Sequence, residues 1–156
     1  MIPLILAAAA SRVAMSTAPN VEPVMAFVIL ASTIGINPAL VGLCTMLLSD
    51  LFLTPGPWTI YTSLTYALVG LLVGVVKPKT RKQITLLSGW LTILYDFITN
   101  IAFALEMGLP ILATLEAGIF FSLVHVLSNM VICAILLPTP IDFLSLSAVK
   151  TSLKTD

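Results

Sequence analysis

Six apolar segments follow one another along the chain, separated by residues that interrupt helices. An apolar run bounded by Pro, Gly, Asn or Ser predicts a helix between the interruptions. The expected helices cover residues 3–15, 23–34, 38–53, 57–76, 83–107 and 109–137. The first two are shorter than the ~20 residues of a perpendicular membrane span. We therefore expect the loop between them to extend them, or both to lie partly within a bundle.

The sharpest interruption separates the third segment from the fourth. Pro55, Gly56 and Pro57 stand together there, and such residues end a helix because Pro lacks an N–H group and Gly is conformationally free. Trp58 and Tyr61 then open the next segment, and amphipathic rings collect at membrane surfaces. The pattern predicts a tight turn at the outer surface that forms part of the mouth of a small-molecule site.

The composition is that of a polytopic membrane protein. Of the 156 residues, 59% are hydrophobic and 9% charged, whereas a soluble domain has roughly 45–50% apolar and about 25% charged residues. The net charge of zero gives no reason to expect nucleic-acid binding. No glycine motif for phosphate binding and no cluster of metal ligands is visible, so we expect neither an enzyme nor a cofactor or metal in this chain.

The basic residues predict the orientation of the helices. Six of the seven occur at two places, between the fourth and fifth segments and in the tail. Positively charged loops face the cytoplasm, and both places satisfy this rule if six helices cross the plasma membrane with both termini inside. The sequence thus predicts an all-α, multi-pass bundle of six transmembrane helices over residues 1–138, embedded in the lipid bilayer. A short cytoplasmic tail covers residues 139–156.

Charged residues within apolar segments are expensive in a bilayer and usually have a function. From the ~1.5 Å helical rise, Asp96 lies roughly 18 Å above the cytoplasmic face and Glu116 about 10 Å below the outer face. Asp50 and Arg12 fall in the same outer half, and Glu22 lies in an outer loop. These residues predict a ligand site at the outer end of the bundle. The alternative is a structural ion pair of Arg12 with Asp50 or Glu22.

Polar residues at helical spacing support a lined cavity. Ser88, Thr92, Asp96 and Asn100 follow one another every four residues and draw one polar stripe along the fifth helix. Hydrogen bonds between helices would explain the same hydroxyl groups. We expect the single histidine, His125, to be a packing residue, since one histidine makes a poor metal site.

Small residues mark faces where another helix can approach closely. Ala10 and Ala14 are four residues apart in an alanine-rich first helix, and Gly70 and Gly74 repeat this spacing in the fourth. Part of this surface must serve packing within the chain. The face of Ala10 and Ala14 is a candidate docking surface for a partner membrane protein.

With these features the chain resembles the substrate-binding S components of energy-coupling-factor (ECF) transporters. The resemblance covers most of the sequence and includes the six-helix plan and the alanine-rich first helix. It also includes PNVEPV at residues 19–24, LVG at 40–42, LSDLF at 48–52, GPWT at 56–59 and LVGLLVG at 68–74. The block of GPWT followed by LVGLLVG is the most specific of these motifs.

The resemblance implies a function in binding and delivery. An S component captures a micronutrient, commonly a vitamin or its precursor, in its outward half. It then docks through the alanines of its first helix on a transmembrane coupling subunit driven by two cytoplasmic ATPases, and topples to release its cargo. By resemblance Ala10 and Ala14 dock, and residues 19–23 form the gate. The expected substrate-binding residues, from the residues and the resemblance together, are Arg12, Asn20, Glu22, Asp50, Trp58, Tyr61, Asp96, Asn100 and Glu116.

Two other classes of function compete with this one. In a self-sufficient small carrier or channel, Arg12, Asp50, Asp96 and Glu116 would form an ion or proton relay. An intramembrane enzyme around Glu116 and His125 is disfavoured, because nine residues of helix separate the two by about 13 Å. A site with tryptophan, tyrosine and charged groups suits a ring-containing vitamin, and no residue decides between cobalamin and riboflavin-like compounds.

Overall fold

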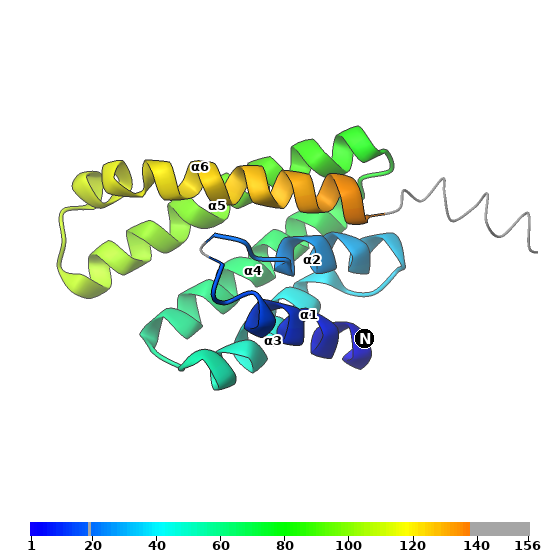
Figure 1. Ribbon diagram of the computed structural model, residues 1–156, viewed down its shortest axis with the longest axis horizontal. Coiled ribbons are helices and arrows are strands. Elements are labelled where there is room, and N and C mark those ends of the chain that lie inside the picture. The colour runs from blue at the N-terminus through cyan, green and yellow to red at the C-terminus, as the bar shows by residue number, and fades with distance from the viewer. Residues whose placement is uncertain (19, 138–156) are drawn as a thin grey trace, which may run out of the picture.

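The described part of the chain forms a bundle of six helices that run alternately in opposite directions (Figure 1). A computed structural model describes residues 1–18 and 20–137. The helices are α1 (Ile2–Ala14), α2 (Val24–Thr33), α3 (Pro38–Leu53), α4 (Pro57–Val76), α5 (Arg81–Met107) and α6 (Ile111–Leu136). The described residues contain no strand, which confirms the all-α prediction. The tail expected at residues 139–156 lies outside the described part of the chain.

The helices begin and end within two residues of the predicted bounds, because the residues at their ends satisfy free backbone groups. The Asn37 side chain accepts hydrogen bonds from the backbone N–H groups of Ala39 (3.0 Å) and Leu40 at the start of α3. Thr80 accepts one from the N–H of Gln83 at the start of α5. Gly108 ends α5 with φ = 63°, a conformation that glycine adopts at no steric cost.

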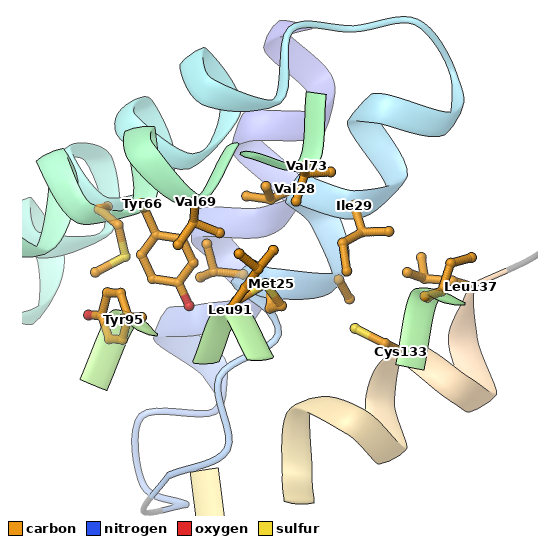
Figure 2. Packing of buried hydrophobic residues seen from close by; sticks show 14 residues of the cluster. Met25, Val28, Ile29, Tyr66, Val69, Val73, Leu91, Tyr95, Cys133 and Leu137 are labelled. Atoms are coloured by element: carbon orange, nitrogen blue, oxygen red, sulfur yellow. The ribbon is translucent and has the colours of Figure 1, made fainter. Parts of the chain in front are cut away.

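The shortest helix, α2, occupies the centre of the bundle and contacts each of the other five. Six of its ten residues are buried. Met25, Val28 and Ile29 pack against Tyr66, Val69 and Val73 of α4 and against Leu91 and Tyr95 of α5, as well as Cys133 and Leu137 (Figure 2). A helix that is apolar on all sides is stable only when other elements surround it. For α2 the structure thus shows one of the two arrangements expected for the short helices, a position within the bundle.

The backbones of α3 and α4 approach each other closely at Gly70. A Cβ atom at this position would lie 2.4 Å from the Cα of Ala39 and 2.5 Å from its backbone nitrogen. No side chain fits in such a contact, so only glycine permits this crossing. The contact holds the start of α3 against the second half of α4.

Within the described residues, three helices are long and apolar enough to cross a membrane, namely α4, α5 and α6. Their outward faces carry large exposed apolar side chains, among them Trp90, Leu112 and Phe120, as expected of surfaces in contact with lipid. The helices α1, α2 and α3 have 13, 10 and 16 residues, fewer than a perpendicular span requires. The six-span topology with cytoplasmic termini therefore stays a prediction.

Candidate functional site

A cavity of about 460 Å³ opens between the helices at the end of the bundle where α1 and α3 end and α4 begins. We call this the cavity end. The opposite end, which holds the N-terminus and the α4–α5 connection, is the basic end (Figure 1). Pockets of 300–1,000 Å³ typically hold drug-sized ligands. The volume therefore suits a small organic molecule.

The cavity results from the unequal lengths of the helices. With a rise of ~1.5 Å per residue, α5 and α6 are each about 40 Å long, whereas α1 is about 20 Å and α2 about 15 Å. The pair α5 and α6 therefore continues past the ends of α1 and α2, and the space beside it is left open. The α1–α2 connection crosses this space and contributes Ser16, Ala18, Asn20 and Val21 to the cavity wall.

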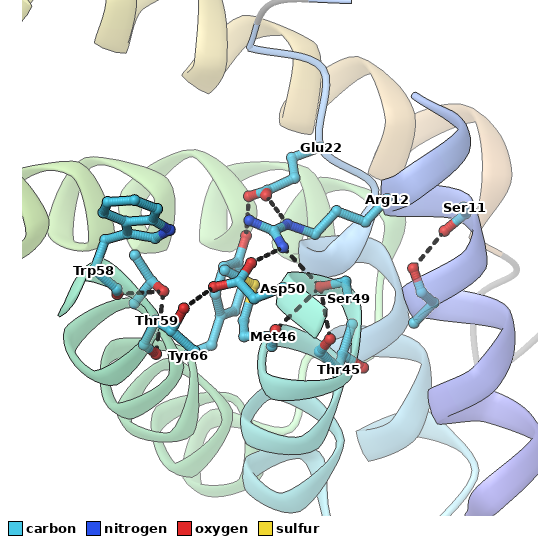
Figure 3. A network of polar contacts seen from close by, with 12 residues as sticks. Ser11, Arg12, Glu22, Thr45, Met46, Ser49, Asp50, Trp58, Thr59 and Tyr66 are labelled. Carbon is cyan, nitrogen blue, oxygen red and sulfur yellow. Dashed lines mark hydrogen bonds and ion pairs between the residues drawn. The ribbon is translucent and has the colours of Figure 1, made fainter. Parts of the chain in front are cut away.

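Arg12 forms the centre of a polar network on one side of the cavity (Figure 3). Its Nε is 2.5 Å from Oε1 of Glu22, and its Nη1 is 2.5 Å from Oδ1 of Asp50. Nη1 also donates to the hydroxyl of Ser49 at 2.6 Å. One guanidinium thus joins the end of α1, the α1–α2 connection and α3. This is the ion pairing that the sequence offered as the alternative to a ligand site, and Arg12 makes it with both carboxylates.

Each carboxylate in this network has a second donor from α4. The hydroxyl of Thr59 donates to Oδ2 of Asp50 at 2.6 Å, and the hydroxyl of Tyr66 donates to Oε2 of Glu22 at 3.3 Å. Charge-assisted hydrogen bonds of this kind offset part of the loss of hydration on burial. Asp50 lies behind Arg12 and outside the cavity wall, whereas Glu22 and Arg12 belong to the wall.

A second buried pair lies across the cavity between α5 and α6. Nδ1 of His125 is 2.8 Å from Oδ1 of Asp96, and both side chains belong to the cavity wall. Among the described residues, neither Oδ2 of Asp96 nor Nε2 of His125 has a hydrogen-bond partner. The sequence predicted that His125 is a packing residue; the ring is buried and bonded to Asp96, and it also belongs to the cavity wall. The His125 ring thus binds the carboxylate that the sequence assigned to the site.

The α1–α2 connection is fastened over the cavity by one hydrogen bond to α6. The hydroxyl of Ser128 donates to the backbone oxygen of Asn20 at 2.6 Å. Asn20 has φ = 63°, in the left-handed region that asparagine tolerates better than most residues. Its side-chain oxygen has no partner in the described part of the chain. This is the segment for which the sequence predicted a gate, and residue 19 of that segment is not described.

Seven of the nine predicted substrate-binding residues belong to the cavity wall. They are Arg12, Asn20, Glu22, Trp58, Tyr61, Asp96 and Asn100. Asp50 reaches the site only through Arg12. Glu116 does not belong to it, because its side chain is exposed on the far side of α6. At 100° per residue, a position nine residues before His125 points in the opposite direction, and Gly118 is the α6 residue that faces Asn100.

Sequence reasoning missed most of the aromatic wall. Tyr95, Phe103 and Phe121 line the cavity with Trp58 and Tyr61. In an apolar helix, aromatic residues that face a cavity have the same spacing as those that face lipid or core. His125 did carry a signal, since it lies four residues before Asn129 on one polar face. The sequence did not show which helix packs against that polar face, so it could not show that His125 contacts Asp96.

Gly56 controls the position of Trp58. A Cβ atom at residue 56 would lie 2.4 Å from the Trp58 ring, which forms part of the cavity wall. The contact is with the far end of a side chain, so we expect Gly56→Ala to displace the ring with little loss of stability. Any small molecule that the protein binds in the cavity should bind about tenfold more weakly, as expected for the loss of an aromatic contact. Titration calorimetry together with thermal unfolding checks this, and a variant with unchanged affinity would contradict it.

The face predicted to dock a partner is free in the isolated chain. Ala10 and Ala14 are exposed, and Pro3, Leu6 and Ala7 lie on the same face of α1. The neighbouring Ala8 and Ala9 are buried instead, where α1 packs on α2 and α3. The alanine run thus serves two faces, one for packing within the bundle and one that remains open.

Among the comparisons with known proteins, only the comparison with protein families gives a match. Residues 1–143 match a protein family described as "Family of unknown function (DUF6580)". No curated protein and no solved structure matches the chain.

Proposed function

The chain belongs to DUF6580, a family of unknown function, and we propose that it is the membrane-embedded substrate-binding subunit of an ECF-type importer. In this role it captures a vitamin or related micronutrient from outside the cell. It then delivers the molecule through a transmembrane coupling subunit driven by two ATPase subunits, which use the ATP. The protein itself binds and delivers, and performs no chemical reaction.

The observation on which this proposal rests is the cavity at the end of the bundle remote from the basic α4–α5 connection. Lys77, Lys79, Arg81 and Lys82 lie around the α4–α5 connection at the basic end. If positive charge faces the cytoplasm, the cavity of about 460 Å³ faces outside. It combines an aromatic wall with few polar groups, as small-molecule sites do. A capture subunit needs this arrangement, since it must meet its cargo on the outer side.

The same proposal assigns all six helices to the plasma membrane, with both termini inside. The short helices α1 and α2 are compatible with this because the α1–α2 connection continues their path at the cavity end. Thr99, Asn100 and Thr62 extend the polar wall there, so water and a ligand can enter the bundle from the cavity end. A backbone without helical structure is tolerated at membrane depth where it lines such a cavity.

The exposed face of α1 supports the docking part of the proposal. We expect Ala10→Trp to abolish co-purification with an ECF coupling subunit, because the bulky ring keeps the two helix backbones apart. The thermal stability of the isolated protein should stay within a few degrees, since residue 10 is exposed. The matched control is Ala113→Trp, an equally exposed alanine on α6, which should assemble normally. Assembly retained in Ala10→Trp would count against the docking face.

One observation favours a second candidate, a self-sufficient carrier with a proton relay. From Asp96 and His125 toward the basic end, the next turns of α5 and α6 carry the fully buried Thr92 and Asn129. Both amide atoms of Asn129 lack a partner among the described residues. Proteoliposomes that hold this protein alone decide between the two candidates. Ion-coupled uptake without any ATPase subunit would favour the carrier, and its absence would favour the importer subunit.

A further inference from the structure

The cavity is surrounded by an excess of negative charge. Glu22 and Asp50 share the single guanidinium of Arg12, while Asp96 has only His125 as its partner. Even when both Arg12 and His125 carry a proton, three carboxylates face two cations. The excess grows by one charge when His125 is neutral.

No other basic side chain in the described part of the chain offsets this excess. The remaining ones lie in the α4–α5 connection and the first turn of α5, at the basic end. They are separated from the cavity by most of the length of α4 and α5. At a buried site, charge is screened far less than at a solvated surface. The cavity therefore attracts cations and repels anions.

The cavity wall offers aromatic faces as well as negative charge. Trp58, Tyr61, Tyr95, Phe103 and Phe121 contribute rings to it. The face of an aromatic ring carries partial negative charge and attracts an organic cation within about 6 Å. Flat rings of a ligand also stack favourably on such faces. The aromatic wall thus adds to the preference for cations that the carboxylates create.

Asp96 supplies the point to which a positively charged or N–H group would bind. Its side chain is 4% exposed, and its Oδ2 atom has no partner in the described residues. A buried carboxylate oxygen without a donor is destabilising until a donor reaches it. The Oδ1 atom is already held by His125, so the carboxylate is fixed in place with one oxygen available.

We propose that the cargo of this cavity is an organic cation that contains a flat ring. The ring lies among the aromatic side chains, and its positive charge or N–H group is directed to Asp96, with Glu22 also in the cavity wall. The inference rests on the proposed role as a capture subunit and names the substrate class for the same site. The cavity, at about 460 Å³, has the size for such a molecule and is far larger than a metal ion.

Three small probes of nearly equal shape test the charge preference directly. These are 1-methylnicotinamide (a cation), nicotinamide (neutral) and nicotinate (an anion), titrated into the purified full chain in detergent or nanodiscs. We expect 1-methylnicotinamide to bind about tenfold more tightly than nicotinamide, with nicotinate weakest. Equal binding of all three, binding of none, or preference for nicotinate would overturn the inference.

Two variants then test whether Asp96 is the residue that causes the preference for the cation. Asp96→Asn keeps the shape and a hydrogen bond to His125 but removes one charge, so it should lower the affinity for 1-methylnicotinamide about tenfold more than the affinity for nicotinamide. Glu116→Gln removes a carboxylate that lies outside the cavity and should change neither affinity. An equal effect of both variants would overturn the assignment to Asp96.

Assembly with the coupling subunit is measured separately, so that the two proposals fail independently. If the chain assembles with the coupling subunit but shows no preference for the cation, the substrate class is wrong and the role as an importer subunit stands. If it prefers the cation but does not assemble, the substrate class stands and the role as an importer subunit is wrong.

Discussion

Replacing Gly70 by alanine is expected to destabilise the protein more than any other single methyl group added to the bundle. The new Cβ would lie 2.4–2.5 Å from backbone atoms of Pro38 and Ala39, which cannot rotate away as a side chain can. Overpacking of this kind destabilises by about 1–3 kcal/mol or more, and a backbone contact belongs at the upper end. We expect a melting temperature lower by on the order of 10 °C.

Gly74 provides the matched control for this prediction. It lies one turn further along the same helix, and a Cβ there would meet Pro38 at 3.5 Å, an ordinary van der Waals contact. Alanine favours helix over glycine by up to about 1 kcal/mol, so Gly74→Ala should leave the stability unchanged or raise it. Thermal unfolding of the two variants in the same detergent measures the difference. Equal melting temperatures would show that α3 and α4 do not cross at Gly70.

Replacing Arg12 by methionine should have the second large effect. It leaves the carboxylates of Glu22 and Asp50 without their shared cation, and Asp50 is only 2% exposed. Removal of one partner from a buried ion pair destabilises by about 3–5 kcal/mol. We expect a comparable fall in the free energy of unfolding, measured by chemical or thermal denaturation. Lys82→Met, at an exposed position, should have no measurable effect.

A triple variant separates the loss of charge pairing from the loss of packing. In Arg12→Met with Glu22→Gln and Asp50→Asn, no unpaired charge remains, while Thr59 and Tyr66 can still donate to the amide oxygens that replace the carboxylates. Most of the lost stability should return, because neutral polar groups are much less costly to bury than charges. If the triple variant is as unstable as Arg12→Met alone, packing of the arginine stem rather than its charge holds the site together.

Much of the candidate site could be predicted because intramembrane polar residues are rare enough to be conspicuous. Asp96 and Asn100 were predicted to share a face from their spacing of four residues, and both line the cavity. Pairing of Arg12 with Glu22 or Asp50 was the alternative to a ligand site, and Arg12 pairs with both. Glu116 was wrongly predicted to line the site for the same reason, since it is also a conspicuous charge in an apolar segment. Its depth in the membrane was estimated from the helix rise, but depth says nothing about the direction in which a side chain points.

The chain by itself determined where its helices begin and end, because Pro, Gly, Asn and Thr act on the backbone of their immediate neighbours. It also determined that these helices are predominantly apolar. Only the tertiary structure decided that the shortest helix, α2, lies at the centre, that His125 meets Asp96, and that the longer α5 and α6 leave a cavity beside the ends of α1 and α2. Those features depend on how far each helix is rotated about its axis and which helix lies beside it. Contacts between distant residues set both, and no local pattern of the sequence records them.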